Sequence, residues 1–68
     1  MIEYTNSQIS ELIDEHIHSD RNRQVLKSRY IDGLTYEALS EKYDLSVTQI
    51  RNIIHKSELI LFKYLKST

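Results

Sequence analysis

The sequence predicts an all-α fold: a small four-helix domain with a C-terminal helix-turn-helix and a long last helix. Three observations support this prediction. The 68 residues contain no proline and one glycine, which argues against a turn-rich all-β chain. Apolar residues recur at intervals of three and four, the spacing of a helix face. Residues that cap helices stand before these apolar runs. At this length we expect one domain over residues 1–68.

The first helix is expected over residues 6–18, where Thr5 and Gln8 fit a capping box at its start. The second is expected over residues 20–31, with Asp20 as its cap. Each helix has an apolar stripe that predicts its buried face. The two stripes are Ile9, Leu12, Ile13 and Ile17, then Val25, Leu26 and Tyr30.

Gly33, the only glycine, stands where the second helix must end and where a positive φ is favoured. The third helix is expected over residues 35–43, with Thr35 as its N-cap. Asp44 follows it, and aspartate tolerates left-handed geometry better than most residues. The apolar residues of this helix are Ala38, Leu39 and Tyr43.

The fourth helix is expected over residues 47–66, because Ser46 and Gln49 form a second capping box. At 1.5 Å per residue such a helix is roughly 30 Å long, which is more than a small three-helix core needs. Its inward stripe is predicted to be Ile50, Ile53, Ile54, Ser57, Leu61, Tyr64 and Leu65.

Charge is unevenly distributed along the chain. Residues 1–20 contain five acids and neither Lys nor Arg, whereas residues 46–68 contain four Lys or Arg and one Glu. This polarity suggests an anion-binding C-terminal half, and ordinary scatter of charge is an equal alternative. The acidic helix within residues 1–19 could shield the basic last helix, although a simply solvated face is favoured.

Several classes of protein are not expected. The absence of cysteine removes disulfides and thiolate chemistry and suits a reducing cytoplasm. No apolar run is long enough for a membrane span, and no secretion signal is visible, so we expect a cytoplasmic protein. His16 and His18 point to different helix faces, which argues against a metal site. No phosphate loop or catalytic constellation suggests an enzyme or a cofactor.

Residues 35–56 have the pattern of a helix-turn-helix. Ser40 supplies the small residue needed where the second helix crosses the first. The second helix then presents polar side chains of the types that read base edges and phosphates, and Val47 can contact a thymine methyl group. The alternative is a helical bundle whose polar face is only solvated. The polar face consists of Thr48, Gln49, Arg51, Asn52, His55 and Lys56.

The segment 23–65 resembles region 4 of bacterial sigma factors, the promoter-reading helix-turn-helix domain. RQVLKSRY resembles the helix before the motif, DGLTYEALSEKYDLS its opening, and IRNIIHKS the recognition helix and its extension. Output domains of the LuxR type share much of this pattern. The resemblance implies a transcription regulator that binds double-stranded promoter DNA. Since the chain lacks length for the other sigma domains, we expect a stand-alone phage or bacterial regulator, with its helix-turn-helix in residues 20–68.

The resemblance also implies roles for individual residues. Primary sigma factors have Arg and Glu where Val47 and Thr48 stand, so their base preference is not expected here. The residues implied to face the groove of a minus-35-like element are Val47, Thr48, Gln49, Arg51 and Asn52. Those implied to flank phosphates are Arg29, Thr35, His55 and Lys56.

The last helix has more apolar residues than its inward stripe needs, namely Leu59, Ile60 and Phe62. The acidic first helix could cover them in a monomer, or a second copy or another protein could do so. Sigma region 4 domains dock on RNA polymerase, and LuxR-type domains dimerise through their last helix. The alternative function is therefore a protein-interaction module that docks on RNA polymerase or another regulator.

Overall fold

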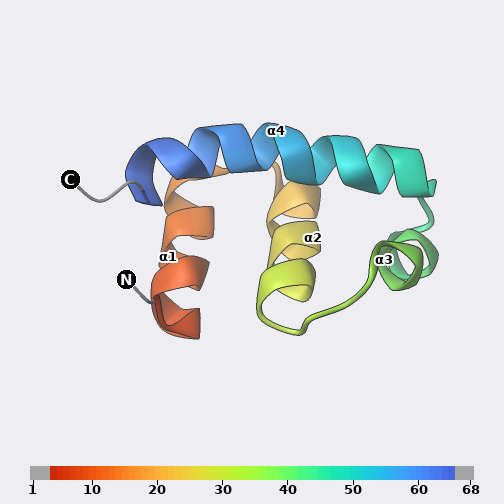
Figure 1. The fold of residues 1–68 in the computed structure, drawn as a ribbon, viewed down its shortest axis with the longest axis horizontal. Helices are drawn as coiled ribbons and strands as arrows, with labels where there is room; N and C mark the ends of the chain where they lie inside the picture. The colour runs from red at the N-terminus through yellow and green to blue at the C-terminus, as the bar shows by residue number, and fades with distance from the viewer. Residues whose placement is uncertain (1–3, 66–68) are drawn as a thin grey trace.

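The helices are α1 (Asn6–His16), α2 (Asp20–Tyr30), α3 (Tyr36–Tyr43) and α4 (Val47–Leu65). The computed structural model describes residues 4–65, and in this range it has four helices and no strand, which confirms the predicted all-α fold. The longest helix, α4, lies across the other three (Figure 1). α1 packs near the C-terminal end of α4 and α3 near its N-terminal end, in a molecule 37 Å long and 19 Å wide.

The helix bounds differ from the expected ones by one or two residues, and the local backbone explains the difference. α1 ends at His16 because Ile17 is extended, with φ −107° and ψ 117°. The prediction that Asp20 caps α2 is wrong. Ser19 is the N-cap, and its Oγ accepts a hydrogen bond of 3.3 Å from the N–H of Asn22. Asp20 is the first helical residue, where a negative charge favours the helix dipole.

Both predicted capping boxes are present. The N–H of Gln8 donates to Thr5 Oγ1 over 3.1 Å, and the N–H of Thr5 donates to Gln8 Oε1 over 2.8 Å. The same exchange joins Ser46 and Gln49, with distances of 3.0 and 2.8 Å. Gly33 has the predicted positive φ, 74°. The helix starts and this chain reversal therefore follow from local sequence.

The apolar stripes of the four helices meet in one core. Ser57 is buried with them, as predicted, whereas Tyr30 and Tyr64 are 36% and 52% exposed and not inward. A tyrosine ring can cover an apolar edge while its hydroxyl stays in water. The predicted stripe residue Leu65 lies outside the described side chains. The buried apolar residues are Ile13, Ile17, Val25, Leu26, Leu39, Ile50, Ile54 and Leu61.

A buried polar junction fixes α3 against α2. Ser28 is 3% exposed, and its Oγ lies 2.7 Å from the Tyr43 hydroxyl, which donates to the carbonyl of Gln24 over 3.0 Å. The ammonium of Lys42 donates to Ser28 Oγ over 3.3 Å. Since a buried hydroxyl is unfavourable without partners, this chain of hydrogen bonds selects one placement of α3.

Candidate nucleic-acid interface

Hydrogen bonds of Ser40 close the turn between α3 and α4. Its carbonyl accepts from the N–H groups of Asp44 and Leu45, the second at 3.0 Å, and its hydroxyl donates to the Leu45 carbonyl over 2.6 Å. Asp44 has the left-handed angles φ 55° and ψ 47°, which reverse the chain. The helix-turn-helix pattern of the sequence explains why residue 40 is small, but it does not predict these hydrogen bonds.

The first turns of α4, residues 47–56, form what we call the recognition segment. Ile50 and Ile54 hold its inner face against buried Leu39 of α3, so the angle between the two helices is fixed by packing. Val47 is half-buried at the start of the segment. The side chains predicted to contact DNA here are otherwise exposed: Thr48, Gln49, Arg51, Asn52, His55 and Lys56.

Four of these side chains are free to bind a ligand. Arg51, Asn52, His55 and Lys56 form no side-chain hydrogen bond or ion pair with any other residue in the part of the chain that the structure describes. Two cations, an amide and an imidazole are thus available within two turns of one helix. Arginine can bind guanine in the major groove through two hydrogen bonds, and lysine suits phosphate.

Gln49 has a second role in the structure. Its Oε1 accepts the N–H of Ser46, so the capping box holds the carbonyl end of this amide at the helix start. The NH₂ group remains as the outward hydrogen-bond donor. Donors match the acceptors that guanine or thymine present in the major groove.

The two predicted phosphate-flanking residues outside α4 lie on either side of the connection between α2 and α3, Arg29 in the last turn of α2 and Thr35 at the start of α3. Thr35 is exposed and caps α3, with its Oγ1 accepting from the N–H of Ala38 over 3.1 Å. Arg29 is half-buried and donates to the carbonyl of Leu34 over 2.8 Å, and its guanidinium lies 4.7 Å from the centre of the Tyr36 ring. These contacts hold the connection between α2 and α3, and a phosphate contact by Arg29 stays a prediction.

The acidic helix does not cover the recognition segment. α1 packs at the opposite end of α4, where the rings of His16 and Tyr64 stack with centroids 3.5 Å apart (Figure 1). One of its acids, Asp14, forms an ion pair of 2.8 Å with Lys27 of α2. The charge pattern raised the alternative that α1 shields the basic last helix; α1 packs against the C-terminal part of α4 and leaves the recognition segment uncovered.

The closed turn and the exposed recognition segment define the chain as a helix-turn-helix protein. More specifically, it belongs to the Sigma-70, region 4 family, whose sequence model matches residues 19–57. The resemblance seen in the sequence is confirmed, and the family is one of DNA-binding domains. Neither the curated proteins nor the solved structures give a significant match.

The first and last residues of the family match show which parts of the chain the family includes. It begins at Ser19, the N-cap of α2, and ends at Ser57, so it includes every residue predicted to contact DNA. It leaves out α1 and the part of α4 that carries Leu59, Ile60 and Phe62. In the described residues, no helix has the length and hydropathy needed to cross a membrane.

Proposed function

We propose that this protein binds double-stranded promoter DNA in a sequence-specific manner and regulates transcription, with the recognition segment lying in the major groove. The observation that carries the proposal is the set of four unpartnered polar side chains on the first turns of α4, held out by a closed turn. Membership of a DNA-binding family supports it. The recognition segment provides the arginine, amide and small side chains that read base edges.

The roles of Arg51 and Lys56 can be separated by measurement. With a site selected from random duplexes, Arg51→Ala is expected to lose about 1–3 kcal/mol of binding free energy at that site and to relax its specificity. Lys56→Ala is expected to weaken all sequences alike and to reduce the salt slope by about 1. Fluorescence anisotropy at several salt concentrations measures both effects.

Lys27→Ala is the matched control, because this lysine is paired with Asp14 beside α1. Its DNA affinity should stay close to that of the wild type. Unchanged affinity of both Arg51→Ala and Lys56→Ala for every duplex would contradict DNA reading by α4.

A second candidate function is protein docking on RNA polymerase or another regulator. The observation that favours it is the exposure of Leu59, Ile60 and Phe62 at the end of α4. If regulation of a reporter promoter survives Arg51→Ala and Lys56→Ala but is lost in Phe62→Ala, docking is the function. If the first two variants abolish regulation, DNA reading is required.

A further inference from the structure

Exposed apolar side chains gather at one end of the molecule. Among the described residues, the exposed large apolar side chains are four on the last turns of α4, with Leu59 at 70% and Phe62 at 56%, and Tyr30 of α2, whose hydroxyl bonds to Glu58 of the same turns. We call this surface the apolar end; it consists of Tyr30, Leu59, Ile60, Phe62 and Tyr64. A soluble protein rarely leaves such a group uncovered, because burying it from water is favourable.

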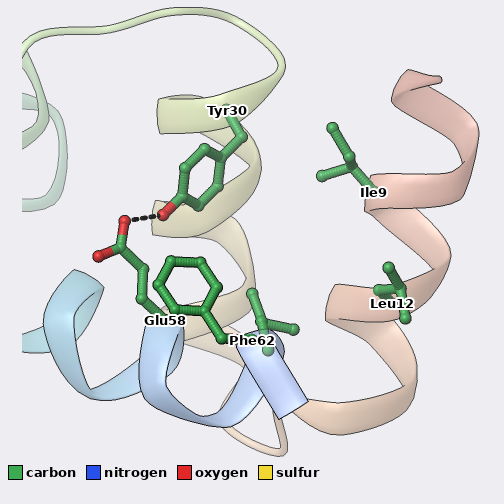
Figure 2. A pocket seen from close by; sticks show the side chains of 6 residues that line it. Ile9, Leu12, Tyr30, Glu58 and Phe62 are labelled. Atoms are coloured by element: carbon green, nitrogen blue, oxygen red, sulfur yellow. Dashed lines mark hydrogen bonds between the residues drawn. The ribbon is translucent and has the colours of Figure 1, made fainter. Parts of the chain in front are cut away.

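A hollow of about 220 Å³ opens beside the apolar end. Figure 2 shows the rings of Tyr30 and Phe62 on one side of it and the side chains of Ile9 and Leu12 of α1 on the other. Leu61 also lines it. The hydroxyl of Tyr30 donates a hydrogen bond to Glu58 at the edge, so the polar groups lie at the rim and the interior is apolar. The hollow therefore suits an aliphatic side chain.

Charged side chains of opposite sign lie near the apolar end, acids on α1 and a lysine on α4. α1 contributes Glu11 and Glu15, which line a second hollow next to Tyr64, and Leu12 belongs to both hollows. α4 contributes Lys63, which forms no ion pair with the other residues that the structure describes. The acids thus lie on the α1 flank of the apolar end, and the lysine lies on α4.

We infer that the apolar end is the docking site for a second copy of this chain, in a two-fold symmetric dimer. Leu59 and Lys63 are four residues apart and lie on the same side of α4. When Leu59 of one copy enters the hollow of the other, its Lys63 comes to the acidic flank of α1. Two-fold symmetry makes the same contacts a second time. The chain itself therefore supplies a helix with the chemistry that the hollow requires.

A dimer also bears on DNA binding, and this part of the inference rests on the proposed function. If the two α4 helices cross near Ile60 and run in opposite directions, each Arg51 lies about 14 Å from the crossing, at 1.5 Å per residue. The two Arg51 residues are then about 28 Å apart, somewhat less than the roughly 34 Å of one DNA turn. The expected DNA site is an inverted repeat with half-sites about one turn apart.

Sedimentation equilibrium without DNA tests the dimer directly. The wild type should dimerise, and Leu59→Asp should raise the dimer dissociation constant at least about tenfold, because it places a charge in an apolar contact. Asn52→Asp is the control, since it makes the same change in net charge on the same side of α4, two turns earlier. It should dimerise like the wild type. A wild type that stays monomeric at submillimolar concentration, or equal dissociation constants for the two variants, overturns the inference.

Charge reversal identifies the occupant as a second copy. Glu11→Lys alone and Lys63→Glu alone should each weaken the dimer several-fold, and the double variant should recover most of the loss. Failure to recover overturns this arrangement. A dimer that binds no duplex supports the docking inference and contradicts the proposed DNA binding. Failure of the dimer and failure of DNA binding can therefore be told apart.

Discussion

At the scale of single residues, Ser40 and Asp44 determine the turn that positions the recognition segment. Ser40 satisfies backbone groups at the end of α3, and Asp44 is the single residue other than glycine with positive φ among those the structure describes. Aspartate adopts this conformation at a smaller cost than a β-branched side chain does.

Substitution of Asp44 should test this assignment. Asp44→Val is expected to destabilise the protein by about 1–2 kcal/mol, whereas Asp44→Gly should be neutral or stabilising by up to about 1 kcal/mol. Urea unfolding measures both. Asp32→Val makes the same change in a connecting segment where φ is not positive. If it destabilises as much as Asp44→Val, the backbone conformation of Asp44 is not the cause.

At the scale of elements, the two capping boxes are chemically alike but begin helices with different roles. Thr5 starts α1, the helix that packs beside the apolar end, and Ser46 starts α4 at the recognition segment. Each cap satisfies backbone N–H groups that the first turn of a helix leaves unpaired. The second box also orients Gln49.

Removing either cap should therefore lower the stability of the protein, but only one of the two removals should also change DNA binding. Thr5→Ala and Ser46→Ala are each expected to lower the free energy of unfolding by about 1 kcal/mol. Only Ser46→Ala should also weaken DNA binding, because it removes the acceptor of the Gln49 N–H and frays the first turn of the recognition segment. Urea unfolding and DNA titration of both variants check this. Equal DNA affinities for the two would contradict a role of the cap in recognition.

At the scale of the whole molecule, the two surfaces lie at opposite ends of α4, and long-range contacts hold the apolar end together. The hydrogen bond from Tyr30 to Glu58 joins α2 to α4 across 28 residues of sequence. Partial burial of the phenol and this hydrogen bond raise the pKa of Tyr30 above its ordinary value of about 10.

This shift gives stability a definite dependence on pH. Because the folded chain holds the Tyr30 proton more tightly than the unfolded chain, its contribution is fully present below about pH 10 and is lost as the pH rises further. Tyr30→Phe should lose less stability between pH 9 and pH 11 than the wild type, measured by urea unfolding. Equal losses would contradict the assignment.

The sequence predicted what depends on neighbouring residues. Spacing and caps located all four helices, and the recognition segment is exposed as its periodicity indicated. Ser19 and Asp20 are both good caps, and the folded backbone decides between them, since Ser19 is extended and its side chain accepts from the N–H of Asn22. The hydrogen bonds of Ser28 and Arg29 could not be predicted, because they depend on how helices pack. DNA contacts by the recognition segment stay a prediction.

α4 is continuous from Val47 to Leu65, with neither glycine nor proline to act as a hinge. Both surfaces therefore belong to one unbroken helix, and the number of residues between them sets the angle between them about the helix axis. Each residue added between Lys56 and Leu59 would rotate one surface by about 100° relative to the other. Length changes near whole turns preserve the alignment and others destroy it, so the length of α4 between the two surfaces is constrained separately from the side chains that form them.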